Sequence, residues 1–77
     1  MREKILILSN KLQTEKIVKF RLYNALYIIT SNNNLFNIRQ YGINRTYTYS
    51  SLNELLTNFI IYGSNLIESV EDIKYID

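Results

Sequence analysis

The stretch IVKFRLY, residues 17–23, is the clearest strand signal in this chain, and the fold can be worked out from it in both directions. Two sets of side chains alternate along it, which is the period-two pattern of a strand buried on one face. The first set is Val18, Phe20 and Leu22, and the second is Lys19, Arg21 and Tyr23. We expect the first set to face the core and the second to face solvent.

Three downstream stretches extend this strand into an antiparallel sheet. Residues 26–30 are apolar on both faces, residues 35–41 alternate again, and residues 45–49 are rich in Thr and Tyr, which suit pleated surfaces. The Asn cluster at 32–34 tolerates left-handed φ angles and predicts a hairpin between the second and third strands.

The register of the last hairpin depends on the turn at Gly42. A two-residue loop pairs Ile38 with Tyr47 and Phe36 with Tyr49, which turns both Tyr rings toward the core. A three-residue loop flips the last strand and exposes both rings. We expect the shorter loop, because it buries the larger side chains.

Helices are expected on either side of the sheet in sequence. Residues 3–13 carry an apolar stripe at helical spacing, with a short strand as the alternative. Ser51 and Glu54 match a capping box, which begins a helix with an apolar stripe over residues 52–60, ended by Gly63. The spacing over residues 66–76 predicts a further helix, with a short strand at 73–76 as the alternative.

These elements together predict an α+β fold. We expect a three- or four-stranded antiparallel meander, with an N-terminal helix and two C-terminal helices packed on one face. A chain of 77 residues without a linker-like stretch predicts a single domain, residues 1–77.

The composition argues against several classes of function. The chain has no Cys and no His, which excludes disulfides, Cys-type zinc sites and His-dependent acid–base catalysis. We therefore expect no enzyme activity, no cofactor and no metal site. The chain shows neither a secretion signal nor an apolar run of about 18–20 residues, so we expect a cytoplasmic protein without membrane association.

The charge is unevenly distributed along the sequence. Residues 11–50 hold six cations and one anion, whereas residues 51–77 hold one cation and five anions. Basic residues interleaved with aromatic ones on an open sheet face suit binding to nucleic acid or to protein, and the alternative is a solvated sheet face, which carries the same residue types as cross-strand pairs. The candidate partner-binding residues are Lys19, Arg21, Tyr23, Arg39, Tyr41 and Arg45.

We expect the chain to be a small protein-binding module. Its size, element order and AT-rich composition, with 12 Ile and 10 Asn, are similar to those of some small phage anti-CRISPR proteins, although no motif is shared. That likeness implies an inhibitor from a phage or mobile element, which would occlude a host defence or nucleic-acid-handling protein. The alternatives are direct nucleic-acid binding through the basic face and a homodimeric structural protein.

Overall fold

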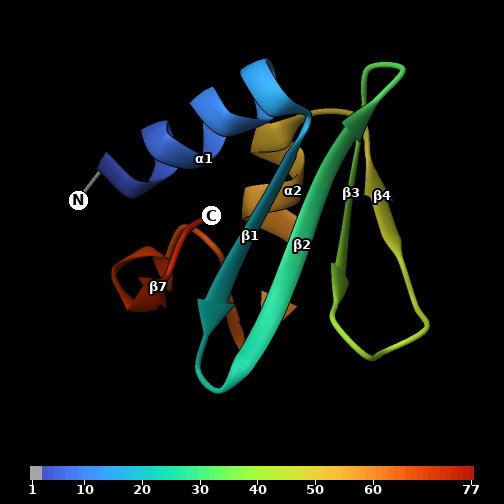
Figure 1. Cartoon of the computed structure of the whole chain (residues 1–77). Helices are drawn as coiled ribbons and strands as arrows, with labels where there is room; N and C mark the ends of the chain where they lie inside the picture. Colours follow the sequence, from blue (N-terminus) through green and yellow to red (C-terminus); the bar gives the residue numbers. More distant parts are fainter. Residues whose placement is uncertain (1–2) are drawn as a thin grey trace.

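The computed structural model describes residues 3–77, and its elements are drawn in Figure 1. In chain order they are α1 (Glu3–Glu15), β1 (Ile17–Leu22), β2 (Ala25–Asn32), β3 (Leu35–Gln40), β4 (Tyr47–Tyr49), α2 (Leu52–Asn58), β5 (Ile60–Ile61), β6 (Ser64–Asn65), the 3-10 turn η1 (Val70–Asp72) and β7 (Ile73–Lys74). The predicted α+β class is confirmed.

Five strands form one antiparallel sheet in the order β4-β3-β2-β1-β7. α1 packs against β1 and β2, and α2 packs against β3 and β4, so both helices cover the same face (Figure 1). We call the opposite face, which no helix of the described chain covers, the outer face. The sheet has one strand more than predicted, because β7 from the C-terminal segment pairs with β1.

The predicted N-terminal helix is confirmed, and the short-strand alternative is not. α1 buries Leu8 and Leu12, which lie one turn apart on the same side of the helix. It ends where Lys16 takes a left-handed conformation (φ 66°), and the amide of Lys16 donates to the carbonyl of Leu12 over 3.2 Å. This single bond is the left-handed type of helix C-cap.

The predicted hairpin signals are confirmed. Asn33 and Asn34 have φ angles of 53° and 63° and close the tight turn between β2 and β3. The register of β3 and β4 pairs Phe36 with Tyr49 and Ile38 with Tyr47 as predicted, but residues 41–46 connect the two strands in place of the expected two-residue loop. Tyr49 is half-buried, whereas Tyr47 is 40 % exposed, so only one of the two rings is largely covered.

The predicted cap of α2 is also present. The amide of Glu54 donates to the Ser51 hydroxyl over 3.0 Å. The Glu54 carboxylate turns back to the amide of Ser50 (3.1 Å), one residue before the expected partner. Both bonds satisfy amides at the helix N-terminus, which have no intrahelical acceptor.

The prediction that α2 runs to Gly63 is wrong. The helix ends at Asn58, and β5 and β6 then form a small hairpin around Tyr62 and Gly63, whose φ angles are 51° and 83°. Two adjacent positive φ angles are the requirement of a type I′ turn, in which Gly is favoured. The adjacent β-branched residues of β5 favour an extended backbone over further helix.

The predicted second C-terminal helix over residues 66–76 is wrong as well. This segment contains only η1 and then β7, so the short-strand alternative is confirmed at residues 73–74. Ile73 is fully buried, and β7 pairs with the open edge of β1. Pairing along that edge satisfies backbone groups that a helix would leave exposed on β1.

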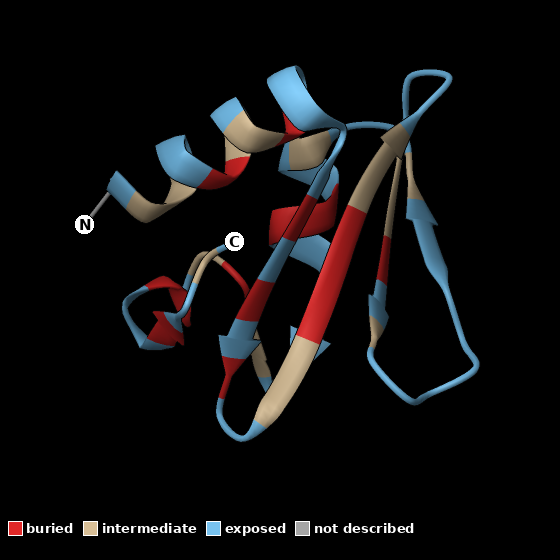
Figure 2. Ribbon diagram, in the orientation of Figure 1, coloured by how far each residue is buried: buried red, intermediate tan, exposed pale blue. Residues whose placement is uncertain are grey.

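The core lies between the helices and the sheet, where the buried segments of Figure 2 face one another. It includes the first alternating set of β1, all three members of which are fully buried, and Ile29 and Ile38 from the next two strands. From the helical layer come Leu8, Leu12, Leu55 and Leu56. The period-two pattern of β1 therefore predicted its buried face correctly.

Candidate functional site

The outer face of the sheet holds four of the six candidate residues. Since the buried residues of β1 face the helices, Lys19 and Arg21 project from the other side. Cross-strand pairing places Lys19 beside Ile28 and Ile28 beside Arg39, in one row across three strands. In a second row, Arg21 lies beside Leu26. Tyr41, which directly follows β3, lies on the other side of Leu26, and its amide donates to the Leu26 carbonyl over 2.7 Å.

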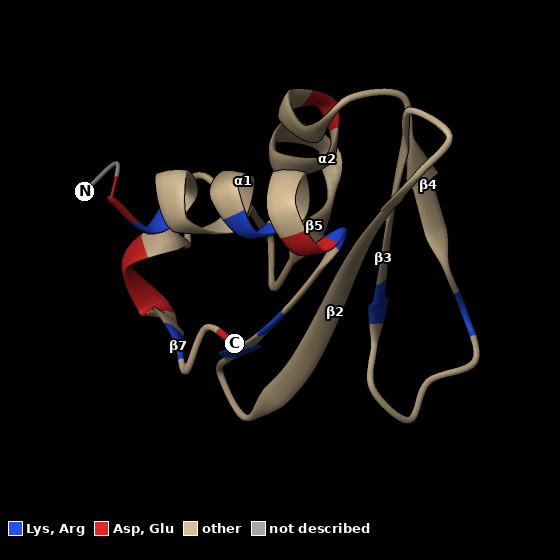
Figure 3. Cartoon of the chain, turned by 45° about the horizontal axis from the view of Figure 1, so that its top comes forward, with Lys and Arg blue, Asp and Glu red and all other residues tan. Residues whose placement is uncertain are grey.

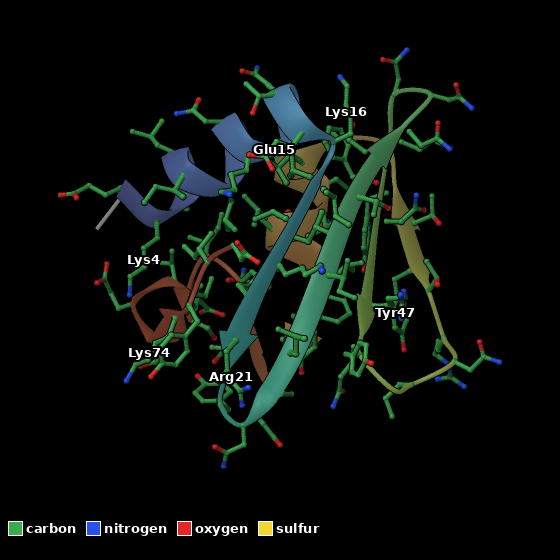
Figure 4. The ribbon with its side chains drawn as sticks, in the orientation of Figure 1. Lys4, Glu15, Lys16, Arg21, Tyr47 and Lys74 are labelled. Carbon is green, nitrogen blue, oxygen red and sulfur yellow. The ribbon has the colours of Figure 1, made fainter. Side chains whose placement is uncertain are left out.

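The structure adds a cation that the sequence prediction missed. Lys74 of β7 is the register partner of Arg21, and both are labelled at the same end of the sheet in Figure 4. Lys74 was missed because residues 66–76 were expected to be helical. The apolar Ile73 followed by the charged Lys74, within the short-strand alternative at residues 73–76, was the signal that could have found it.

The strands of the five-stranded sheet carry four cations and no carboxylate (Figure 3). These cations are Lys19, Arg21, Arg39 and Lys74. Within residues 3–77, none of them forms a salt bridge, and the one ion pair found there joins Lys11 to Glu15 on α1 over 3.5 Å. The strands of the sheet therefore carry only positive charges, and the carboxylates of the described chain lie on the helices, turns and loops around them.

Two carboxylates approach the border of this face. Asp77 continues the pairing of β7 with β1, since its amide and carbonyl bond to the backbone of Lys19 over 2.8 and 3.0 Å. Asp72 lines a hollow with Arg21, Lys74 and the exposed Tyr75, but its Oδ2 accepts a hydrogen bond from the Tyr23 hydroxyl over 3.2 Å. The centre of the outer face contains no acidic side chain.

Apolar side chains separate the cations. Ile28 is only 7 % exposed and yet lies outside the core cluster, because the neighbouring side chains of the outer face cover it. Leu26 is half-buried, and Tyr41 at the end of its row is 66 % exposed. The face therefore combines spaced positive charge with an apolar floor and one exposed ring.

The expectation that Tyr23 shares a face with Lys19 and Arg21 is wrong. β1 ends at Leu22, and Tyr23 has a φ of 53° in the turn that follows, which breaks the alternation. Its hydroxyl reaches Asp72, and its ring contacts that of Tyr62 edge-on, with 5.5 Å between centroids. Tyr23 fixes the turn to the C-terminal segment instead of facing outward.

Arg45 also lies apart from the outer face. The register of β3 and β4, continued into their connecting loop, puts Arg45 on the same side as Tyr47, which is the helix side of the sheet. The Arg45 guanidinium donates to the Tyr47 hydroxyl over 3.5 Å, and this bond raises the pKa of Arg45 above its ordinary value. The structure therefore groups Lys19, Arg21, Arg39 and Tyr41 on the outer face. Tyr23 lies at the border of that face, where it lines the same hollow as Arg21, and Arg45 lies on the opposite side.

Further observations limit the chemistry of the described residues. Within residues 3–77, no group of Asp and Glu side chains is arranged to hold a metal ion. Neither helix in this part of the chain has the length and apolar character needed to cross a membrane.

No protein-family model, curated protein or solved structure matches this chain, so the argument for the outer face rests on its own residues.

Proposed function

We propose that this chain is a non-enzymatic protein-binding module whose outer face engages an acidic surface of a partner protein. The observation that carries the proposal is the pairing of Arg21 with Lys74, two cations directly opposite each other on neighbouring strands. Like charges in that position destabilise a sheet. An anionic partner would offset this repulsion on binding.

The side chains around the cations support a protein partner. Arg and Tyr are enriched among the residues that dominate protein interfaces, and Arg39 and Tyr41 lie on one strand and its extension. The apolar floor of Leu26 and Ile28 provides area that a partner can cover. A rigid sheet face needs little rearrangement on binding, so the module would act by occluding the surface that it covers.

Nucleic-acid binding is the second candidate, favoured by the four sheet cations, which form no salt bridge within residues 3–77. Single-stranded nucleic acid is bound by several aromatic side chains that stack on successive bases. The exposed rings lie at the border of the outer face, Tyr41 at the end of one row and Tyr75 beside the hollow of Arg21 and Lys74, and no ring projects from the central rows of the described strands. For this reason we rank protein binding first.

A homodimer joined through two outer faces is disfavoured by charge. Two-fold pairing brings the same patch of each copy together, so the cations of Arg21, Arg39 and Lys74 would face those of a second copy. A homodimer joined elsewhere is the third candidate. Light scattering tests it, since the chain has a mass of 9.2 kDa.

The test of protein binding is a quantitative pull-down with the tagged chain from a lysate of a low-GC bacterium, run with and without nuclease, so that nucleic acid can be retained in one arm and a protein that binds directly is retained in both. We expect a retained protein whose recovery falls at least about tenfold with Arg39→Ala, the scale of an Arg hot spot. The matched control is Lys11→Ala, which removes a cation from α1 instead of the sheet.

Two results would overturn the proposal. Equal recovery by the Arg39→Ala and Lys11→Ala variants would show that the outer face is not the binding surface. Retention of nucleic acid alone would move nucleic-acid binding to first place. Its affinity should then fall with salt by about 0.7 to 0.9 log units per log unit of salt for each phosphate contacted.

A further inference from the structure

A groove on the helix side of the sheet lies outside the surface discussed so far. It has a volume of about 580 Å³ and opens between β4, the β3–β4 loop and the segment after α2. It exists because α2 ends at Asn58 and leaves this end of the sheet without a helix over it. Figure 4 shows the Tyr47 side chain at this side of the sheet, beside β4.

Aromatic and branched side chains line most of this groove. The ring of Phe59 contacts those of Tyr47 and Tyr27 edge-on, with centroids 5.3 and 6.1 Å apart. Tyr47, Ile43 and Ile60 are 40 %, 50 % and 56 % exposed along its walls. These exposed apolar walls are suited to contact with an apolar side chain.

The groove contains one charged residue, Arg45. Its guanidinium donates to the Tyr47 hydroxyl, and it forms no salt bridge within the described chain. A guanidinium has five donors, so most of them are free for a second partner. An occupant that complements this groove in charge therefore carries a carboxylate.

The edge of the sheet runs alongside the groove, since β4 is an edge strand. The Tyr41 amide bonds to β2, and along a strand the backbone groups of successive residues point to opposite sides. Ile38 and Phe36 therefore point their amides and carbonyls toward β4, where they bond to Tyr47 and Tyr49. The intervening Thr48 then turns its amide and carbonyl away from β3. Thr48 is exposed, so an added strand can reach both groups.

We propose that an extended peptide segment of a partner protein pairs with the edge of β4 and places alternate side chains in the groove. This is strand addition, in which backbone bonds supply affinity and side-chain pockets supply specificity. Arg45 and Tyr47 lie two residues apart on the same side of the chain. The partner's peptide segment therefore has an apolar residue and an acidic residue two positions apart. The apolar residue lies beside Tyr47, and the acidic residue lies beside Arg45.

This site is independent of the outer face, because strand addition at β4 needs none of the four sheet cations. A titration of isotope-labelled protein with short blocked peptides, followed by NMR, tests it. The first peptide has the central sequence Phe-Thr-Glu. We expect saturable shifts of the Tyr47, Thr48 and Ile60 amides, and slower hydrogen exchange at the Thr48 amide when the peptide is bound.

Two control peptides test the spacing and the charge. A peptide with Phe and Glu adjacent has the same composition, but puts the two side chains on opposite faces of a strand and should bind several-fold more weakly. A Phe-Thr-Gln peptide should bind about twofold to fivefold more weakly than Phe-Thr-Glu, as expected for one exposed ion pair.

Two protein variants complete the test. Arg45→Gln should abolish the preference for Glu over Gln, whereas Lys11→Gln, which removes a cation from α1, should preserve it. Equal binding of the adjacent and spaced peptides would overturn strand addition. Absence of saturable shifts, or a Glu preference that survives Arg45→Gln, would overturn the proposed site.

Discussion

The hydroxyl group of Tyr23 donates a hydrogen bond to Oδ2 of Asp72 over 3.2 Å and lies 3.5 Å from the hydroxyl of Ser69. These residues join the turn between β1 and β2 to η1, which directly precedes β7. The bond therefore holds the C-terminal segment in the position from which Lys74 pairs with Arg21.

Removing this bond should destabilise the fold modestly. Tyr23→Phe keeps the ring and its contact with Tyr62, so the expected loss in free energy of unfolding is about 0.5–1.5 kcal/mol, the net value of one hydrogen bond. Urea unfolding of Tyr23→Phe, Asp72→Ala and the double variant gives the coupling energy. Strictly additive losses would mean that Tyr23 and Asp72 do not interact in solution.

The Arg21–Lys74 pair should be costly for the isolated protein. Replacing Lys74 by Thr removes the repulsion and provides a residue that suits strands, so we expect a gain of about 0.2–1 kcal/mol in free energy of unfolding. Arg21→Thr should give a similar gain. The gain should shrink at high salt, where the repulsion is screened. A loss of stability in both variants would contradict the repulsion and weaken the argument for an anionic partner.

The N-terminus of α2 depends on one hydroxyl. Ser51→Ala removes the acceptor for the Glu54 amide, and we expect a loss of about 1 kcal/mol in free energy of unfolding. Ser50→Ala is the control, since it keeps the backbone amide that donates to the Glu54 carboxylate and loses only the longer bond, 3.3 Å, from the Ser50 hydroxyl to that carboxylate. Thermal unfolding of both variants should place Ser51→Ala clearly below Ser50→Ala, and equal midpoints would show that the cap contributes nothing.

Stability at high pH should depend on Tyr27. Burial, and to a lesser extent the charge of Tyr62, raises the pKa of Tyr27 above its ordinary value of 10.0. The unfolded chain then loses this proton first as pH rises. The contribution of Tyr27 to the free energy of unfolding is therefore complete below pH 10, and it is lost as pH rises through the folded-state pKa.

Tyr27→Phe provides the corresponding measurement. Phe keeps the stacked contact with Phe20, whose ring centroid lies 5.7 Å away, but cannot ionise. The free energy of unfolding should therefore fall less steeply above pH 10 in this variant than in the natural sequence. Parallel curves for the two proteins would show that Tyr27 does not contribute to the alkaline transition.

The elements predicted correctly from sequence are those specified by nearby residues. The alternation in β1, the Asn33–Asn34 turn and the cap at Ser51 each depend on side chains acting on adjacent backbone. The register of Ile38 with Tyr47 was predicted from burial of the larger side chains, and it holds although residues 41–46 form a longer connection than the expected two-residue loop.

The errors arose where distant segments decide the local structure. The helical spacing of apolar residues over 66–76 also suits a segment that buries Leu66, Val70 and Ile73 without being helical. β7 is short, and the open edge of β1 supplies its pairing partner. The residues close to Ile73 in sequence carry no signal that the edge of β1 is free to pair with them.

The same division applies to the candidate site. Sequence alternation by itself determined that Lys19, Arg21 and Arg39 face away from the core, because side chains of a strand must alternate. Only the tertiary structure decided that Tyr23 leaves that face, that Lys74 joins it and that Arg45 belongs to a groove on the opposite side. The physical reason is that alternation sets the face within one strand, whereas the order of strands and the course of the turns depend on packing between segments far apart in the chain.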